Sequence, residues 1–355
     1  MQPETKSLTP LLSIVIPCYN VARYIDRCLD SITVQAFQNI EIIAVDGGSK
    51  DETYAKVTKR AEEEPRLATI PTERIGPGRA RNIGAQHATG DYIWFVDGDD
   101  QLAPGCLSVI AERLHAQRPD VLLINHAVLM PDGALRSSHD HRMIMREDDG
   151  SFEIADRPWL VDLSLVCWNK IVRREFLASA GAEFASSWPH EDVPHSCNVL
   201  LTAHRLAVFS AVCYHYRQRP GSTTSAGPRR RHFAVFETWP PVLERIRIGT
   251  TESYRLREVY RRFFQRSIWH CSMILDTTGL IARADRRAFF RSISTMYNAY
   301  VPAGYRLPNG FRGIKFWLIA RNFYVGYAAL HPLNKARMAM VRTINRTRTR
   351  PDTAS

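Results

Sequence analysis

The chain has 355 residues, of which 45% are hydrophobic and 23% are charged, and it carries a formal net charge of +11. This composition is typical of a globular protein and excludes a collagen, a coiled-coil rod, a small disulfide scaffold and a wholly disordered chain. At roughly 150 residues per domain, the length predicts about two domains, each long enough to bury a hydrophobic core.

The positive charge is concentrated at the C-terminal end of the chain. Residues 304–355 contain ten Lys or Arg and a single acid, Asp352. A basic surface attracts polyanions such as anionic lipids and phosphorylated ligands. The run Arg229–Arg231 is also basic, but no nucleic-acid-binding pattern surrounds it, so we expect no nucleic-acid partner.

Cysteine usage and the N-terminal segment indicate a cytoplasmic protein. The seven cysteines include no C-x-x-C pair, which is typical of reduced thiols. Residues 1–10 are polar and lack the apolar core of a secretory signal. No run of about 20 uncharged apolar residues occurs, so the sequence predicts no transmembrane helix.

The first 126 residues alternate between strand and helix patterns. The apolar run Leu11–Ile16 predicts a strand, and the apolar residues that recur from Val21 to Ile32 predict a helix. The elements predicted next are a strand over 40–45, a helix over 51–64, a strand over 67–70, a helix over 79–88, a strand over 92–96, a helix over 104–117 and a strand over 121–125. This alternation predicts an α/β fold with a mostly parallel central sheet flanked by helices.

The rest of the chain changes character. Residues 127–158 are rich in loop formers, residues 159–220 mix strand and helix patterns, and the chain from about 229 onward is helical and Arg-rich. Residues 219–228 combine Gly, Pro, Ser and Thr, which predicts a connecting loop. We therefore expect an N-terminal tail over 1–10, an α/β domain over 11–220 and a helical, basic region over 221–355.

Polar clusters follow three of the predicted strands. They are Pro17–Asn20 after the first strand, Asp46–Asp51 after the second and Asp97–Asp100 after the fourth. Ligands of open parallel sheets bind beyond the carboxyl ends of the strands. We therefore expect the three clusters to converge on one rim of the sheet.

The strongest of these signals is the set of carboxylates Asp97, Asp99 and Asp100. Carboxylates this close repel one another unless a cation lies among them, and their hard oxygens suit Mg²⁺ or Mn²⁺. Such an ion can bridge the protein to a diphosphate. The alternative is an acidic turn ahead of the helix that begins near Pro104, and both interpretations fit these residues taken alone.

Two neighbouring segments carry weaker signals. Asp46 can accept hydrogen bonds from a nucleobase or a ribose, whereas Asp51 suits the N-cap of the next helix. Arg79 and Arg81 follow glycines at a predicted helix start, where they can face phosphates. The alternative for this segment is a surface loop with solvated arginines.

A second acidic pair, Glu191 and Asp192, lies between two histidines. One of these carboxylates can act as a general base if its surroundings raise its pKa. The alternative is that Asp192 caps a helix. His190 and His195 lack the spacing of a zinc-binding helix, and Pro194 interrupts the segment between them, so we expect no zinc site there.

Two further motifs have simpler explanations. His139–His141 contains ligand-type side chains, but it lies in a polar loop and is expected to be solvated. Trp168 precedes a segment with helical periodicity and is expected to be a core residue.

In order and spacing, these motifs resemble the inverting glycosyltransferases of family 2, which have the GT-A fold. The segments that carry the resemblance are Leu12–Asn20, Val45–Asp51, Ala80–Gly84, Ala88–Asp100, Trp168–Lys170 and Glu191–Asp192. Each motif is weak alone and specific in this order, and together they extend over residues 11–220. The resemblance implies a Rossmann-like GT-A domain, and beyond about residue 228 it gives no guidance.

The resemblance also implies a nucleotide-diphospho-sugar donor. Asp46 would contact the base, which is expected to be uracil, and Arg81 would lie near the diphosphate. The nucleotide pocket would be lined by Pro17, Tyr19 and Asn20. Asp99 would ligate a divalent cation, Mn²⁺ or Mg²⁺, with Asp97 near the ribose or the metal.

In the implied reaction, Asp192 is the catalytic base and Glu191 orients the acceptor or the loop. Asp192 would remove the proton of an acceptor hydroxyl as it attacks the anomeric carbon, and this single displacement inverts that centre. The implied enzyme transfers a hexosyl or N-acetylhexosaminyl group to a glycan, polymer or lipid-linked acceptor in cell-surface polysaccharide synthesis.

One departure and two rival functions remain open at this point. Gly47 stands where many family members have a second Asp, and this difference affects which nucleobase the donor site would prefer. A sugar-nucleotide pyrophosphorylase would need a Gly-rich basic loop after the first strand, where this chain has Pro17–Asn20. A non-catalytic binding or assembly subunit would have no need of Asp97, Asp99 and Asp192.

The C-terminal segment Phe311–Leu330 mixes bulky apolar residues with sparse cations. It is followed by Lys335, Arg337, Arg342, Arg346, Arg348 and Arg350. A basic amphipathic helix can lie in an anionic membrane interface, which would suit a membrane-bound acceptor and a peripheral location on the cytoplasmic face. The alternative is a helical subdomain whose aromatic residues are packed, and both descriptions can hold together.

Overall fold

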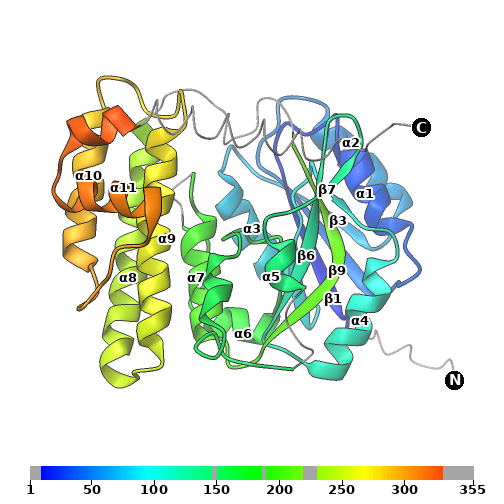
Figure 1. Cartoon of the computed structure of the whole chain (residues 1–355). Coiled ribbons are helices and arrows are strands. Elements are labelled where there is room, and N and C mark those ends of the chain that lie inside the picture. Colours follow the sequence, from blue (N-terminus) through cyan, green and yellow to red (C-terminus); the bar gives the residue numbers. More distant parts are fainter. Residues whose placement is uncertain (1–8, 146–149, 186–188, 219–229, 331–355) are drawn as a thin grey trace, which may run out of the picture. The chain divides into compact units, whose positions relative to one another are not determined.

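The computed structural model describes residues 9–145, 150–185, 189–218 and 230–330. Contacts divide the chain into two compact units, one formed by residues 1–226 and 237–263 and the other by residues 227–236 and 264–355. The α/β domain, whose elements are labelled in Figure 1, lies within the first unit. The expected boundary near residue 220 lies outside the described residues.

The strands of the described residues form one sheet in the order β3-β2-β1-β4-β8-β6-β9-β5, with β7 paired to β6. Their bounds are Leu12–Cys18 (β1), Ile40–Asp46 (β2), Leu67–Pro71 (β3), Tyr92–Phe95 (β4), Gln101–Leu102 (β5), Val121–Leu129 (β6), Leu135–Ser137 (β7), Lys170–Arg173 (β8) and Leu206–Arg217 (β9). The first four strands of this order are parallel, whereas β8 is antiparallel to both β4 and β6. The predicted α/β fold is confirmed, with a sheet that is parallel up to β4 and mixed beyond it.

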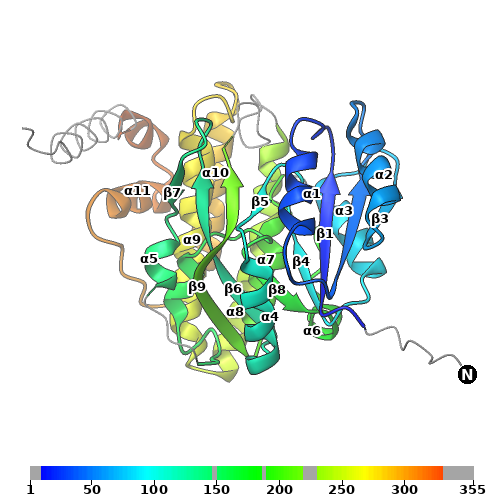
Figure 2. The ribbon, with the colours of Figure 1, turned by 90° about the vertical axis from the view of Figure 1, so that its right-hand side faces the viewer.

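Helices cover both faces of this sheet. Their bounds are Ile25–Thr33 (α1), Thr53–Glu63 (α2), Pro77–His87 (α3), Cys106–Gln117 (α4), His141–Ile144 (α5), Arg174–Ser179 (α6) and Asp192–Thr202 (α7). Because side chains alternate along a strand, Ile14 and Ile16 pack with α1, α2 and α4, while Val15 packs on the other face with α3. Figure 2 shows α1 and α4 on the face of the sheet that is turned toward the viewer.

Helix α3 packs closely on β1 and thereby positions a residue of the site. A Cβ atom built on Gly84 would collide with the side chain of Val15, so the helix could not approach the strand this closely with a larger residue. The N-terminal turns of α3 consequently lie near the carboxyl ends of the parallel strands. Arg81, in the second of these turns, is buried there.

From residue 230 onward the described chain is helical, as predicted. The bounds are Arg230–Ala234 for a short 3₁₀ helix, Val235–Glu252 (α8), Leu256–Asp276 (α9), Arg286–Tyr300 (α10) and Gly310–Ala320 (α11). Within the second unit, Phe233 and Phe236 pack against Phe289, and the buried ammonium group of Lys315 pairs with Asp276. Among the described ranges, we find no helix whose length and apolar character would let it span a bilayer.

Candidate functional site

The three polar loops at the carboxyl ends of β1, β2 and β4 lie side by side. The backbone N–H of Asn20 donates to Oγ of Ser49 (3.1 Å), and the N–H of Lys50 donates to Oδ1 of Asn20 (2.8 Å). The third loop adjoins the first, since a Cβ atom on Gly98 would lie 3.4 Å from the carbonyl oxygen of Pro17. The expected convergence of these loops on one rim of the sheet is confirmed.

Asp46 ends β2 with one carboxylate oxygen fixed and the other unpaired. Oδ2 accepts the N–H groups of Gly48 (3.1 Å) and Ser49 (2.9 Å), in a turn for which Gly48 supplies a left-handed φ of 75°. Oδ1 is buried and has no hydrogen-bond partner within the described part of the chain. Because a buried acceptor without a partner is costly, this oxygen suits a ligand that brings an N–H or O–H donor.

The residues expected to line a nucleotide pocket lie around the same rim. The ring of Tyr19 is 37% exposed, and the guanidinium of Arg74 lies 5.8 Å from its centroid. Pro17 is half-buried at the end of β1. Asn20 has a left-handed φ of 52°, and its side chain braces the loop after β2 through the bond to Lys50.

The acidic cluster after β4 separates into a structural residue and two residues at the rim. Asp100 is 1% exposed; its Oδ2 accepts the hydroxyl of Tyr214 and its Oδ1 accepts the N–H of Arg217, both at 2.7 Å. The Tyr214 hydroxyl in turn accepts the N–H of Asp97 (3.1 Å). Asp100 therefore ties the loop to β9, while Asp97 and Asp99 are only half-buried.

Arg81 is the centre of the charge network at this site. Its side chain is buried, and its guanidinium contacts Asp97 at 2.7 Å, Asp192 at 3.1 Å and Glu191 at 3.3 Å. Asp97 follows β4, whereas Glu191 and Asp192 lie at the start of α7, 111 positions from Arg81 in the case of Asp192. The buried guanidinium of Arg81 thus brings together three carboxylates that were singled out from the sequence.

Glu191 and Asp192 lie in surroundings that disfavour their ionised forms. Burial and the charge of Asp192 raise the pKa of Glu191 to about 7, against the opposing effect of Arg81. Burial also raises the pKa of Asp192; Arg81 and a hydrogen bond from the Cys167 thiol oppose this rise, and the charge of Asp97 adds to it. Raised pKa values suit carboxylates that accept a proton near neutral pH.

Asp192 does not cap helix α7, which was the alternative role considered for it. Asp192 is the first residue of α7, its predecessor Glu191 occupies the N-cap position, and no side-chain hydrogen bond caps this helix. The two carboxylates are directed to Arg81 instead.

Three buried residues of this region had no role assigned from the sequence. They are Cys167, Lys170 and Tyr214. The ammonium group of Lys170 donates to the carbonyl oxygen of Val166 and to Oδ1 of Asn169, both at 2.7 Å, and burial lowers the pKa of this group to about 8.

Tyr214 stacks on Trp168 with 4.6 Å between ring centroids, and Trp168 is 4% exposed, which confirms it as a core residue. Lys170 was signalled only by the Trp-Asn-Lys motif, and Tyr214 by no motif.

The histidine-containing segments have structural surroundings. His195 is buried, stacks on Phe184 with 3.9 Å between centroids, and has Nδ1 2.6 Å from the carbonyl oxygen of Ala182. The prediction that His139–His141 is solvated is wrong for Asp140, which is buried because it begins the short helix packed against β6 and β9. Its Oδ2 accepts the N–H of Ser164 (3.0 Å).

The residues implied as metal ligands fit part of a coordination sphere. Asp97 and Asp99 offer hard carboxylate oxygens, although one oxygen of Asp97 pairs with Arg81. Nowhere in the described ranges do three or more His, Cys, Asp or Glu side chains form a group that could hold an ion alone. Mg²⁺ is commonly held by one or two protein carboxylates, with substrate phosphates and water completing its shell. The pair therefore suits an ion that binds together with a diphosphate.

Comparison with known proteins relates part of the chain to a family. Residues 13–179 match the sequence model described as Glycosyl transferase family 2. The chain is 27% identical over 227 residues to the uncharacterized glycosyltransferase EpsJ of Bacillus subtilis (strain 168), over 61% of this chain and 64% of EpsJ. It is also similar to the poly(ribitol-phosphate) beta-N-acetylglucosaminyltransferase TarS of Staphylococcus aureus (strain Mu50 / ATCC 700699), with 28% identity over 208 residues. That alignment covers 58% of this chain and 35% of TarS. The chain thus spans less than two thirds of the length of either relative.

The fold is also similar to solved structures. The crystal structure of S. aureus TarS 1–349 in complex with UDP-GlcNAc matches with a TM-score of 0.70 and 20% identity, over 92% of this chain and 91% of that chain. A second crystal structure of S. aureus TarS matches with a TM-score of 0.70 and 19% identity, over 90% of this chain and 55% of that chain. At such identities the likeness concerns the fold, and the expected GT-A fold is confirmed.

Proposed function

Since the chain belongs to glycosyltransferase family 2, we propose that it transfers a hexosyl or N-acetylhexosaminyl group from a UDP-sugar to an acceptor hydroxyl, with inversion. The observation that carries this proposal is the buried contact of Arg81 with Asp192, beside Asp97 at the end of β4. It holds a carboxylate of raised pKa at the rim where ligands of such sheets bind.

The proposed donor site is built on Asp46. Its unpaired Oδ1 accepts the ring N–H of uracil, and its other oxygen is held by the turn amides. Tyr19 and Pro17 line the pocket for the uracil, and Asn20 holds the loop after β2 in place. Support for uridine comes from TarS, a similar fold that has been crystallised with UDP-GlcNAc.

In the proposed mechanism, Asp192 acts as the base. Its carboxylate takes the proton of the acceptor hydroxyl, whose oxygen forms a bond to the anomeric carbon. The bond from that carbon to the diphosphate breaks in the same step, and UDP leaves with the bonding electron pair. Arg81 keeps its charge throughout and holds Asp192 in position, with Glu191 sharing the same guanidinium. Attack from the side opposite to UDP inverts the anomeric centre.

Asp99 and Asp97 would hold a divalent cation, Mn²⁺ or Mg²⁺, together with the donor diphosphate. When bound, such an ion neutralises the charge that develops on the departing diphosphate. The acidic pair at the rim and the need of a diphosphate for counter-charge support this assignment.

Replacing Asp46 by Asn is expected to weaken UDP binding by about tenfold or more. The carboxylate both accepts the turn amides and receives the base, and an amide group cannot accept hydrogen bonds at both ends. Calorimetric titration with UDP measures the change. Asp26→Asn, which changes an exposed aspartate of α1 that is paired with Lys56, is the matched control and should bind UDP as the wild type does. Equal affinities of the two variants would refute the role of Asp46.

Removal of divalent metal is expected to weaken UDP-GlcNAc binding by about tenfold or more, because the diphosphate then lacks its charge-assisted contact with the cation. Titration in Mn²⁺ and in EDTA measures this effect. Asp99→Asn should show the weaker affinity even in Mn²⁺, whereas Asp30→Asn, on the exposed side of α1, should retain the metal response. A wild-type affinity that is the same in Mn²⁺ and in EDTA would contradict the metal assignment.

We further propose that the enzyme acts at the cytoplasmic face of a membrane, on a glycan, polymer or lipid-linked acceptor of cell-surface polysaccharide synthesis. On α11, Ile314 is 50% exposed and Trp317 is 40% exposed, while Phe316 is buried on the other side. The guanidinium of Arg321 lies 4.2 Å from the centroid of the Trp317 ring. Exposed apolar side chains beside cations suit an anionic membrane interface. The basic residues from Lys335 onward, which would add to this attraction, lie outside the described residues.

Deleting residues 332–355 is expected to release the protein from vesicles that contain phosphatidylglycerol. The deletion removes the basic residues that follow α11, each of which contributes about 1 kcal/mol near an anionic surface. Co-sedimentation with anionic and with neutral phosphatidylcholine vesicles measures binding, and Trp317→Glu in the full chain tests the apolar contribution. Unchanged co-sedimentation of both variants would rule out the proposed membrane contact.

A further inference from the structure

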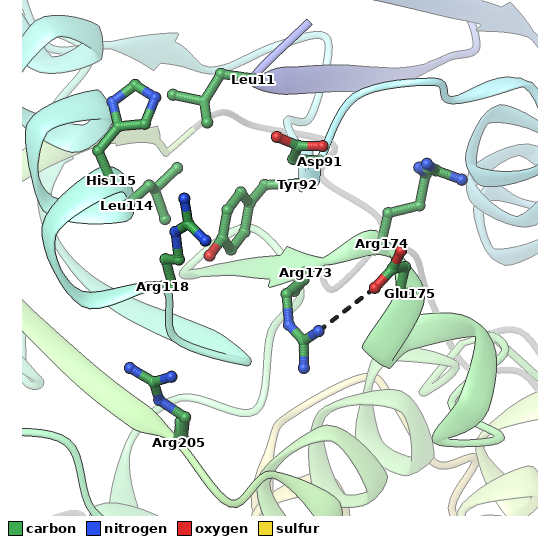
Figure 3. Close-up of a pocket in the computed structure, with 10 residues that line it drawn as sticks. All are labelled: Leu11, Asp91, Tyr92, Leu114, His115, Arg118, Arg173, Arg174, Glu175 and Arg205. Carbon is green, nitrogen blue, oxygen red and sulfur yellow. Dashed lines mark ion pairs between the residues drawn. The ribbon is translucent and has the colours of Figure 1, made fainter. Parts of the chain in front are cut away.

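A pocket opens at the end of the sheet opposite to the proposed donor site. It lies beside Leu11 and Tyr92, where β1 and β4 begin, and has a volume of about 430 Å³ (Figure 3). Asp46 and Asp97 lie at the other ends of the parallel strands, and a strand of this length spans roughly 20 Å. The pocket is therefore separate from the site described above, and its volume is in the range of small-ligand sites.

Arginines from several segments line this pocket. Arg118 follows the C-terminus of α4, Arg173 ends β8, and Arg205 precedes β9. Figure 3 shows Arg118 beside the ring of Tyr92, Arg173 and Arg205 farther from it, and the neighbouring Arg174 directed away. Guanidinium groups that converge in this way repel one another unless an anion lies among them, and their planar forks match the oxygens of a phosphate.

Arg118 and Arg205 are exposed, whereas Arg173 is half-buried. As far as the described ranges extend, no hydrogen bond or ion pair involves the guanidinium of Arg118, and Nε of Arg173 is buried without a partner. Arg205 uses one terminal nitrogen to donate to the carbonyl oxygen of Gln117. Buried donors are normally satisfied, so Nε of Arg173 in particular points to a ligand that accepts hydrogen bonds.

Nearby carboxylates offset part of these charges, and the ion pairs that involve them are made with Arg173. Asp120 is buried and pairs with Arg173 while it also accepts two backbone N–H groups, so it offsets the charge of Arg173. Glu175 lies 3.6 Å from Arg173, but its side chain is 80% exposed, so this pair contributes little. Asp91 also lines the pocket and is exposed to solvent.

Tyr92 adds a neutral donor to the same space. Its side chain is 4% exposed, and burial raises the pKa of its hydroxyl to about 12, against the opposing charges of Arg173, Arg205 and Arg118. The positive charges of the three guanidinium groups thus act on one hydroxyl. This hydroxyl remains protonated at neutral pH and can donate to an oxyanion.

We propose that this pocket binds a phosphate group, held by Arg118, Arg173 and Arg205 and by the hydroxyl of Tyr92. The phosphate belongs either to a small phosphorylated molecule or to one phosphodiester unit of a longer chain. In both cases the recognised chemistry is an oxyanion that accepts several charge-assisted hydrogen bonds. Because the pocket lies at the other end of the sheet from Asp192, the phosphate anchors a ligand and does not react.

Calorimetric titration of the full chain with sn-glycerol 3-phosphate at low salt tests this proposal. The wild type is expected to bind, and Arg118→Gln and Arg205→Gln are each expected to bind about tenfold more weakly. Arg136→Gln, which removes an exposed charge from β7, is the matched control and should bind as the wild type does. Saturating UDP should leave the phosphate affinity unchanged, since the two sites are separate. Thermal unfolding of each variant checks that the fold is intact.

The same titration with glycerophosphoglycerol, a phosphodiester, distinguishes the two sources. Equal or tighter binding of the diester identifies a unit of a longer chain, and preference for the monoester identifies a small phosphorylated molecule. The proposal is overturned if the wild type binds neither compound, if Arg118→Gln and Arg205→Gln bind like Arg136→Gln, or if UDP displaces the phosphate.

Discussion

Replacing Asp192 by Asn is expected to lower kcat by about 10² to 10⁴, the range over which a positioned general base contributes. The amide is the same size and can still accept a hydrogen bond from Arg81, but it cannot take the acceptor proton. Binding of the UDP-sugar should change little, because Asp192 does not contact the donor in the proposed mechanism. The measurement is a release assay for UDP with a calorimetric titration of the same variant.

Asp162→Asn is the matched control for this prediction, since that aspartate pairs with Arg262, whereas Asp192 pairs with Arg81. It should retain wild-type kcat. Activity of Asp192→Asn equal to that of this control would exclude Asp192 as the base. A wild type that binds the donor and never turns it over would favour the non-catalytic alternative.

The pH dependence of kcat follows from the same residue. Asp192 accepts a proton only when ionised, so activity is present above its pKa and is lost as the pH falls through it. Burial raises that pKa above the ordinary value of an aspartate, and the pKa of the adjacent Glu191 is raised to about 7. The loss of activity should therefore begin at a higher pH than an exposed aspartate would give.

Replacing Arg81 by Met is expected to destabilise the protein by about 3–5 kcal/mol, the cost of leaving buried charges without their partner. Asp97, Glu191 and Asp192 all depend on this guanidinium. For a chain of this size the loss corresponds to a fall in Tm on the order of 10 °C. Because the positive charge of Arg81 opposes the rise at Glu191 and Asp192, the pKa of each of these two carboxyl groups should also rise further.

Arg79 provides the control for this experiment. It lies two positions before Arg81 on α3 and is exposed, so the Tm of the Arg79→Met variant should lie within about 1 °C of the wild-type Tm. Arg81→Lys keeps the charge but lacks the fork that reaches three carboxylates, and an intermediate Tm is expected. If Arg81→Met unfolds at the same temperature as Arg79→Met, the network does not hold the site together.

Much of the fold could be predicted from local patterns. The apolar runs that became β1, β2 and β4 are buried on both faces, so their composition alone identifies them. Parallel pairing then brings Asp46 and the Asp97 loop to one rim, as expected. The local sequence did not predict that β8 lies antiparallel between β4 and β6. Tertiary packing determines which strands pair when they are far apart in the sequence.

The site was predicted less completely. Glu191 and Asp192 were singled out as an acidic pair and received their roles from the family resemblance, but their contact with Arg81 across 110 and 111 positions could not be derived from spacing. Asp140 was predicted to be solvated, because a polar loop sequence does not reveal that its helix packs against the sheet. Tyr214, which bonds both Asp100 and the backbone of Asp97, lies in a strand with no motif to mark it.

The central claim is that the chain uses a UDP-sugar, and a thermal-shift panel of nucleotide sugars in Mn²⁺ tests it most directly. At 100 times its dissociation constant, a ligand that binds only the folded state adds about 2.7 kcal/mol of stability. The account predicts a clear upward shift with at least one UDP-sugar and none with the sugars of guanosine or cytidine nucleotides. A shift with only those other nucleotides, or with no nucleotide sugar at all, would contradict it.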